Sequence, residues 1–342
     1  MTAAASTAIE VRRHLDRSEV LDVFALVDDA TRHDGVTPLS EHVVLHLRHG
    51  GDDDVRHLLA RDGDGGLSGY AHLDVTDLVE GPSAEAVVRP RHRQQGVGTA
   101  LVRRTLEIAR TDAPGLGLRL WSHGESAASR GLADALGFSR ARVLWQMRRS
   151  LVAPLPDAPL PEGIVLRTYL PGLDDDAWLV VNAAAFSGLP DQGGWTLDDL
   201  RRRQAEPWFD PRGFLVAIDE RGEIAGFDWT KVHGGPQDGA RQPTDHSHPG
   251  ESEHEHLHAA GAPHAHEHGH EPLGEVYVIG VEPGHQGTGL GRALVVAGLR
   301  HLASLGLTQA MLYVDASNTP AIGLYSSLGF SHWDTDVLYR HA

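Results

Sequence analysis

Two glycine-rich turns, one in each half of the chain, contain the residues best suited to bind a charged ligand. In the second half an apolar run, residues 275–281, precedes the segment Gln286-Gly-Thr-Gly-Leu-Gly291, and the first half has Arg93-Gln-Gln-Gly96-Val-Gly98. A strand that leads through such a turn into a helix presents unpaired backbone N–H groups and the positive end of a helix dipole. This arrangement favours a phosphate or pyrophosphate. A Walker-type loop is excluded, because no Gly-Lys-Ser/Thr follows the glycines.

Two residues near the second turn could transfer protons. Glu275 is the first residue of the apolar run, and strict alternation along a strand predicts that Glu275, Tyr277, Ile279 and Val281 share one face. Tyr325 follows Asn318 by seven residues, about two helical turns, so a helix there places both on one face. The simpler alternatives are a solvated carboxylate at a strand end and a core tyrosine.

The elements that must position these residues occur twice. Strand-like runs at 55–61, 67–75 and 84–88, the first turn and a helix to about residue 110 are followed by Leu136-Gly-Phe138. The second half repeats this order. A shift of 193 residues places Arg93 on Gln286 and Gly96 on Gly289, and a shift of 192 places Leu136-Gly-Phe138 on Leu328-Gly-Phe330. Two motifs at a nearly constant offset indicate duplication of one fold.

Length and composition favour two domains in a protein of the cytoplasm. The chain has 342 residues, and a stretch with four prolines, residues 150–163, predicts an extended linker between domains at 1–149 and 164–342. The net charge of −17 argues against nucleic acid, and the absence of cysteine excludes disulfides and thiolate chemistry. No apolar run reaches the length of a membrane span, and no signal peptide is recognisable. We expect a monomer.

One segment departs from the repeat. Residues 236–272 are rich in His, Glu, Gly and Pro and contain too few apolar residues to form a core, which predicts a disordered surface insertion. Its alternate imidazoles could bind Zn or Ni weakly, but we expect that no metal is required.

The turns belong to a narrower pattern. Gln/Arg-x-x-Gly-x-Gly/Ala after a strand that ends in Val-x-Pro resembles the acyl-CoA signature of the GCN5-related N-acetyltransferases (GNAT superfamily), and residues 312–330 resemble its companion signature. The resemblance implies an α/β fold in each half, a twisted, mixed and mostly antiparallel sheet flanked by helices. It also implies that the motif strand and the next strand splay apart around the pantetheine of the coenzyme.

A closer resemblance, over nearly the whole chain outside the insertion, is to the mycothiol synthase family of tandem acetyltransferases. It is carried by segments such as Asp34-Gly-Val-Thr-Pro-Leu-Ser-Glu41, Gln192-Gly-Gly-Trp-Thr196 and Trp229-Thr-Lys-Val-His233. It implies acetyl transfer from acetyl-CoA to the cysteinyl amine of a glucosamine–inositol pseudodisaccharide, with direct attack in a ternary complex.

The resemblance also implies roles for individual residues. Glu275 is the expected base and Tyr325 the expected acid that protonates the coenzyme thiolate. The expected substrate contacts are Glu41, Asp191, Lys231, Tyr313 and Glu275. The expected acetyl-CoA contacts of the second half are Ile279, Gly280, Val281, Gln286, Gly287, Thr288, Gly289, Leu290, Gly291, Arg292, Asn318, Thr319, Pro320, Ala321, Ile322 and Gly323, and those of the first half are Ala86, Val87, Val88, Gln94, Gln95, Gly96, Val97, Gly98 and Thr99.

The first half lacks both proton-transfer residues. By the two offsets of the repeat, Pro82 stands at the position of Glu275 and Ala133 at the position of Tyr325, and neither can titrate. We therefore expect a catalytically degenerate first domain and a working second one. Two alternatives stay open: a GNAT enzyme acting on another primary amine, such as a protein N-terminus or an aminoglycoside-like compound, and a non-catalytic acetyl-CoA sensor or metal-buffering protein.

Overall fold

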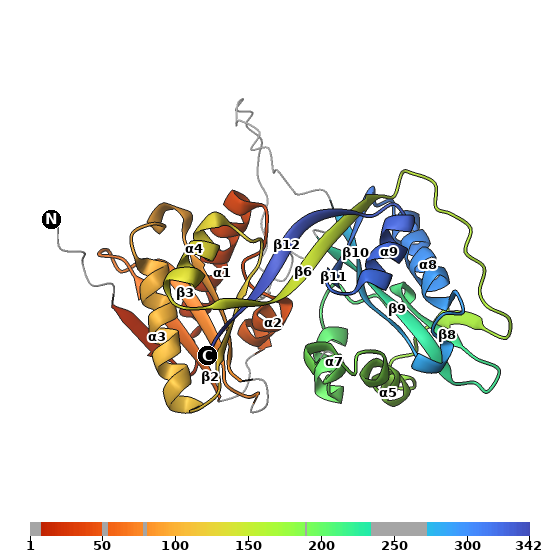
Figure 1. Ribbon diagram of the computed structural model, residues 1–342, viewed down its shortest axis with the longest axis horizontal. Helices are drawn as coiled ribbons and strands as arrows, with labels where there is room; N and C mark the ends of the chain where they lie inside the picture. Colours follow the sequence, from red (N-terminus) through yellow and green to blue (C-terminus); the bar gives the residue numbers. More distant parts are fainter. Residues whose placement is uncertain (1–7, 50–53, 78–80, 189, 234–271) are drawn as a thin grey trace, which may run out of the picture. The chain divides into compact units, whose positions relative to one another are not determined.

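The computed structural model describes residues 8–49, 54–77, 81–188, 190–233 and 272–342 (Figure 1). The predicted insertion at 236–272 therefore lies outside the described residues, except for Pro272. By contacts between residues the chain divides into two compact units. Unit 1 comprises Met1–Met147, Tyr313–Ser326 and Ser331–Ala342, and unit 2 comprises Arg148–Leu312 and Ser327–Phe330.

Unit 1 contains a sheet covered by helices on both faces. Its strands lie in the order β1-β2-β3-β4-β5-β12-β6, where β12 (Ser331–His341) comes from the end of the chain. Strands β4 and β5 run parallel, whereas the pairs β1-β2, β2-β3, β3-β4 and β5-β12 are antiparallel. The elements are β1 (Ile9–Arg12), α1 (Arg17–Asp34), α2 (Glu41–His49), β2 (Val55–Arg61), β3 (Leu67–Asp74), β4 (Ser83–Val88), η1 (Pro90–His92), α3 (Val97–Asp112), β5 (Leu118–Ser122), α4 (Ala127–Ala135) and β6 (Ser139–Ser150).

Alternation along β2 and β3 distributes their side chains between two cores. Leu58 and Ala71 face α3 and α4, whereas Leu59 and Tyr70 face α1 and α2. The helices begin where the chain supplies caps: Asp16 accepts a hydrogen bond from the backbone N–H of Glu19 and so caps α1.

The second half repeats this plan. Its strands lie in the order β11-β10-β9-β8-β7, and β10 with β11 is the parallel pair that corresponds to β4 with β5. The elements are β7 (Val165–Thr168), α5 (Asp175–Ala185), α6 (Pro190–Gly193), α7 (Leu197–Gln204), η2 (Pro211–Gly213), β8 (Phe214–Ile218), β9 (Ile224–His233), β10 (Leu273–Val281), η3 (Pro283–His285), α8 (Leu290–Ser304), β11 (Gln309–Asp315), α9 (Thr319–Ser327) and β12 (Ser331–His341).

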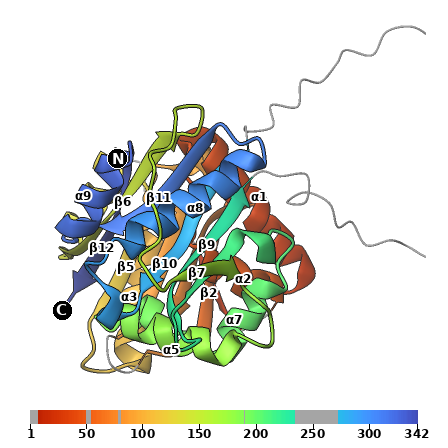
Figure 2. The same cartoon turned by 90° about the vertical axis from the view of Figure 1, so that its right-hand side faces the viewer.

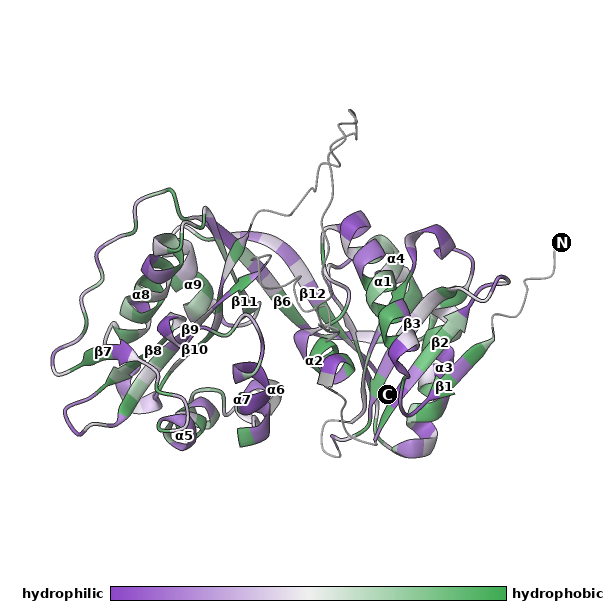
Figure 3. Ribbon diagram, turned by 180° about the vertical axis from the view of Figure 1, so that it is seen from behind, coloured by the Kyte–Doolittle hydropathy of each residue, from purple (hydrophilic) through white to green (hydrophobic). Residues whose placement is uncertain are grey.

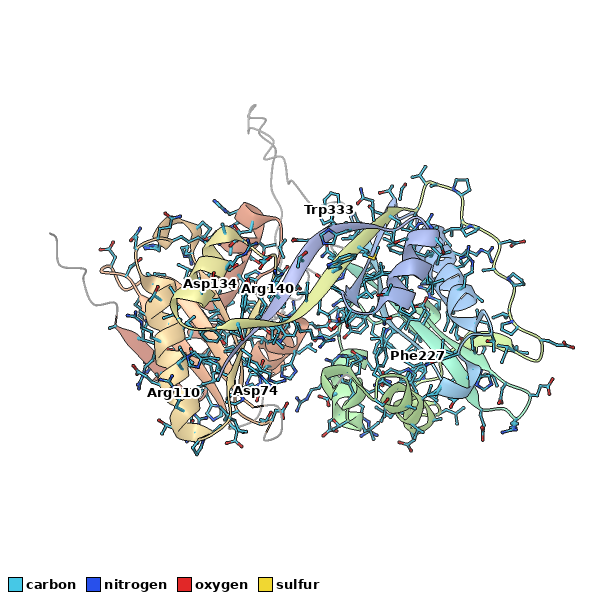
Figure 4. The ribbon with its side chains drawn as sticks, in the orientation of Figure 1. Asp74, Arg110, Asp134, Arg140, Phe227 and Trp333 are labelled. Atoms are coloured by element: carbon cyan, nitrogen blue, oxygen red, sulfur yellow. The ribbon has the colours of Figure 1, made fainter. Side chains whose placement is uncertain are left out.

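Unit 2 packs α5 and α7 against one face of its sheet and α8 against the other (Figure 2). The core on the α5 side is aromatic and contains Trp178, Phe214, Trp229 and Phe227, the last of which is labelled in Figure 4. Helix α7 is predominantly hydrophilic (Figure 3), and Leu200 is its one buried apolar residue among those described. The predicted fold class, α/β with mixed and mostly antiparallel sheets flanked by helices, is confirmed in both halves.

The last strand of the chain belongs to the sheet of the first half. Strand β12 pairs antiparallel with β5, from Val337 opposite Ser122 to His341 opposite Leu118. Residues 151–164 form no helix or strand, and their role as a linker stays a prediction. The boundaries 1–149 and 164–342 stay a prediction; the compact units depart from them because two C-terminal segments pack with the N-terminal half.

Candidate active site

In unit 2 the glycine-rich turn joins β10 to α8. Gly287 and Gly289 have φ values of +76° and +93°, which favour glycine, and Gly289 caps α8 without a side-chain hydrogen bond. The Gln286 side chain donates to the carbonyl of Val281 at 3.3 Å, which ties the turn back to the strand. The first backbone N–H groups of α8 are therefore not used by a side-chain cap, as an anion site requires.

Next to this turn, β10 leaves its parallel neighbour. The register with β11 covers Gly274, Glu275 and Val276, whereas β10 continues to Val281. The predicted coenzyme residues Ile279–Val281 thus lie beyond the register with β11, in the part of β10 that pairs with β9. Their backbone groups on the β11 side can bond the amides of an extended ligand, as another strand would.

Unit 1 repeats both features. The register of β4 with β5 covers Ser83, Ala84 and Glu85, and β4 continues to Val88. The Arg93 side chain donates to the carbonyl of Val88 at 3.0 Å, as Gln286 does to Val281. Gly96 has a φ of +88° and caps α3. Positions 193 residues apart therefore share equivalent contacts as well as similar residue types, which supports the predicted duplication.

A cavity of about 1000 Å³ opens at this turn in unit 1. Its lining includes seven of the predicted coenzyme residues, Ala86, Val87, Val88, Gln94, Gly96, Gly98 and Thr99. Two others are placed elsewhere: Val97 is buried in the α3 core, and the Gln95 side chain donates to the carbonyl of Arg91. Arg93, at the cavity wall, also makes a two-pronged ion pair with Asp34, at 2.7 and 2.6 Å.

Glu275 is buried in unit 2, with 6% of its surface exposed. It lies opposite Lys231 of β9 in the antiparallel register, and its Oε2 is 2.7 Å from Nε2 of His233. The Lys231 ammonium lies over the rings of Trp208 and Tyr277, at 4.4 and 5.3 Å from their centroids. Cation–π contacts of this kind fix a lysine head group that would otherwise be mobile.

The predicted common face of the β10 side chains is wrong in part. The register with β9 shifts between Val276 and Val278, so Tyr277 is the extra residue of a β-bulge. Tyr277 packs with the aromatic core on the α5 side, as Lys231 does through its ring contacts. Ile279 and Val281 pack with Leu290 and Leu294 of α8 on the opposite side. The bulge changes the alternation, so Glu275 and Tyr277 share a face without Ile279 and Val281.

The second predicted signature forms the end of β11 and helix α9. Asn318 accepts a hydrogen bond from the backbone N–H of Ala321, and Tyr325 lies in α9 with 8% of its surface exposed. Tyr313 accepts a hydrogen bond from Gln146 at 2.9 Å. These residues belong to unit 1, whereas Glu275 belongs to unit 2. The joint action of Glu275 and Tyr325 therefore stays a proposal.

The remaining predicted residues are placed as follows. Glu41 is in the first turn of α2, in unit 1. Asp191 lies in α6, and its side chain is outside the described residues. Arg292 donates to the hydroxyl of Ser327 at 2.9 Å. Thr288 donates to the carbonyl of His285 at 2.7 Å and so closes the turn.

Sequence reasoning missed a buried ionic network beside the cavity of unit 1. His123, which lines the cavity, is 2.9 Å from Asp336 and 3.5 Å from Glu85. Burial alone would lower the pKa of His123, but the interactions with Asp336 and Glu85 outweigh it and raise the pKa to about 10. Tyr339, also in the lining, donates to Glu125. Glu85 within an apolar strand was a signal of this network in the sequence. The pairing of Asp336 with His123 had no such signal, because the two residues lie 213 positions apart.

Comparison with known proteins identifies the family of this arrangement. The model of the acetyltransferase (GNAT) family matches residues 23–138 and 184–330, one copy in each half. The chain belongs to the GNAT family. The mycothiol acetyltransferase of Acidothermus cellulolyticus is 54% identical over 338 residues, which covers 98% of this chain and 95% of that protein. The mycothiol acetyltransferase of Streptosporangium roseum is 49% identical and covers 97% and 98%.

Solved structures support the tandem fold. A tandem GNAT protein from the clavulanic acid biosynthesis pathway has a TM-score of 0.67 at 17% identity, with 98% of each chain covered. A GCN5-related N-acetyltransferase from Sphaerobacter thermophilus has a TM-score of 0.65 at 24% identity, covering 97% of this chain and 95% of that one. The predicted family and the predicted acyltransferase class are thereby confirmed.

In the described part of the chain, no helix is long and apolar enough to span a bilayer. Within the same residues, no group of three or more His, Asp or Glu side chains is arranged to hold a metal ion.

Proposed function

We propose that this GNAT enzyme transfers the acetyl group of acetyl-CoA to the cysteinyl amine of the glucosamine–inositol pseudodisaccharide, which gives mycothiol. The observation that carries the proposal is the buried Glu275 on the strand that leads into the glycine-rich turn. The relatives named mycothiol acetyltransferase support the choice of acceptor, because the identity of 54% extends over 98% of this chain.

The proposed chemistry begins with the acceptor. An ammonium cannot attack a thioester, so Glu275 takes its proton. The amine nitrogen then forms a bond to the thioester carbon, and the resulting oxyanion is stabilised by backbone N–H groups of β10 beyond its register with β11. The C–S bond breaks, the amide nitrogen releases its second proton to solvent, and the thiolate receives a proton from Tyr325. Solvent then takes the proton from Glu275 and reprotonates Tyr325.

The acceptor contacts are proposed on chemical grounds. The substrate has a cationic amine and many hydroxyl groups, which suits the carboxylates of Glu41 and Asp191 and the hydrogen-bonding groups of Lys231 and Tyr313.

The first half is proposed to bind acetyl-CoA without turning it over. The cavity at its turn and the end of β4 beyond its register with β5 support binding. Pro82 and Ala133, at the positions of Glu275 and Tyr325, support the absence of turnover there, because neither side chain carries a titratable proton.

The test offers the purified enzyme acetyl-CoA and, separately, the cysteinyl pseudodisaccharide amine, an N-terminal peptide and an aminoglycoside, with coenzyme A release measured by chromatography as the readout. We expect turnover of the first acceptor. Glu275→Gln and Tyr325→Phe should each lower kcat by about 10²–10⁴-fold, because each removes one proton-transfer group. The exposed Glu223→Gln serves as the matched control. Turnover of peptide alone would contradict the acceptor, and full activity of Glu275→Gln would contradict the mechanism.

A further inference from the structure

The carboxylate of Glu275 is held from the end of the neighbouring strand. His233 is the last residue of β9, and its Nε2 lies 2.7 Å from Oε2 of Glu275. The His233 side chain is 37% exposed, whereas that of Glu275 is 8% exposed. An ionised carboxylate can only accept hydrogen bonds, so the His233 nitrogen that faces it carries the proton.

The strand register explains why these two residues meet. Glu275 lies directly opposite Lys231, and His233 is two residues further along β9, opposite Leu273. Positions separated by two residues on a strand share a face, so Lys231 and His233 both flank Glu275. Lys231 lies over the rings of Trp208 and Tyr277. The side chain of His233 reaches Oε2 of the carboxylate from the end of β9.

A base on a flexible side chain needs such a partner. Glutamate has three rotatable bonds, and a general base works only within hydrogen-bond reach of the proton that it takes. A hydrogen bond to one carboxylate oxygen fixes the side chain and leaves the second oxygen for the acceptor. The bulge at Tyr277 lies between Glu275 and Ile279, the first of the predicted coenzyme residues on β10. The backbone alone therefore does not set the direction of the carboxylate.

We propose that His233 is the positioning residue for Glu275, holding Oε2 through its Nε2–H so that the other oxygen receives the proton of the acceptor amine. The proposal rests on the proposed role of Glu275 as the base. It assigns no contact between His233 and either substrate, so the predicted effect falls on kcat and leaves the KM for acetyl-CoA unchanged.

The experiment measures steady-state kinetics of the full-length enzyme with three histidine variants. His233→Ala should lower kcat by about 10–100-fold, the loss expected when a reacting group is misplaced by about 1 Å. His233→Gln, whose amide N–H can replace Nε2–H, should recover most of that loss. His332→Gln, at an exposed histidine hydrogen-bonded to Thr335, is the matched control and should equal the wild type. A change in KM alone, or no rescue by glutamine, would overturn the proposal.

A double-mutant cycle isolates the connection to Glu275. If His233 acts only through the base, His233→Ala should cost nothing further in a Glu275→Gln background. If the losses in kcat of the two single variants multiply in the double variant, His233 acts independently of Glu275 and the proposal is rejected. Circular dichroism and coenzyme titration confirm that each variant is folded.

The outcome stays separate from that of the proposed function. A wild-type enzyme that acetylates a different amine contradicts only the acceptor, and the cycle is then measured with that amine. If no amine is turned over, the same four proteins are compared by the free energy of unfolding. A nonzero coupling between positions 233 and 275 then supports the pair, and a zero coupling rejects it.

Discussion

At the scale of single residues, Asp228 is the side chain least expected from sequence rules. It is fully buried in β9, and neither of its carboxylate oxygens has a hydrogen-bond partner among the described groups. Burial raises the pKa of this carboxyl well above its ordinary value. Gly298 of α8 makes room for it, because a Cβ at this position would clash with Oδ2 of Asp228.

Asp228 should make the protein less stable as pH rises. Its folded pKa is raised, so its contribution to stability is complete below the unfolded pKa of about 3.9 and is lost at about 1.4 kcal/mol per pH unit above it. Asp228→Asn is neutral at every pH and should melt several degrees higher than the wild type at pH 7, at about 2–4 °C per kcal/mol. Scanning calorimetry from pH 4 to 7 checks this. Parallel curves for the two proteins would contradict it.

At the scale of elements, the strands of unit 1 place titratable side chains side by side in its interior. His57 of β2 pairs with His72 of β3, which pairs with Glu85 of β4, all on the face toward α1 and α2. His46 of α2 covers them, with ring centroids 5.6 Å from His57 and 5.0 Å from His72. Asp74, labelled in Figure 4, ends β3 two residues after His72.

This row should make unit 1 sensitive to acid. Burial, with the charge of neighbouring histidines, lowers the pKa of His57 to about 4 and that of His72 to about 3. Below the unfolded pKa of about 6.5, these two histidines are protonated in the unfolded chain but stay neutral in the folded chain. Stability should therefore fall between about pH 6.5 and 4.5, by about 1.4 kcal/mol per pH unit for each histidine.

The check for this acid sensitivity is chemical unfolding from pH 7 to 4.5. In His72→Gln the free energy of unfolding should depend less steeply on pH, because unfolding takes up one proton fewer. The exposed His332→Gln should leave this pH dependence unchanged. An unchanged slope in His72→Gln would show that this histidine keeps its ordinary protonation behaviour.

At the scale of the whole molecule, β12 at the end of the chain joins the sheet of unit 1. The strand pairs with β5, and Asp334 and Tyr339 of β12 line the cavity of unit 1. Asp336 accepts hydrogen bonds from the backbone N–H of Gly124 and from His123. Arg140 of β6 (Figure 4) joins the same region through an ion pair with Glu125, which also accepts from Tyr339. Strand β12 thus forms part of the cavity wall, whereas the glycine-rich turn at that cavity comes from residues 93–98.

The attachment of β12 should weaken in alkali. The folded pKa of His123 is raised to about 10, so its contribution to stability is complete below about pH 6.5 and is lost as pH rises through 10. Asp336→Asn removes one of the carboxylates that hold this proton. It should lower the melting temperature at pH 7 and flatten the decline toward pH 10, as calorimetry would measure. Asp334→Asn, on the same strand, is the matched control. Equal melting temperatures for Asp336→Asn and the wild type would refute the role of the ion pair.

The sequence by itself determined the features that depend on neighbouring residues. The glycines with positive φ, the helices that follow them and the offset of 193 residues were all predictable, because turn geometry and strand patterns are local. Only the tertiary structure decided which distant side chains meet. The bulge at Tyr277 broke the predicted alternation, and His233 reached Glu275 across 42 residues. Strand β12 brought Asp336 to His123 across 213 residues, because sheet pairing depends on long-range packing that no local pattern specifies.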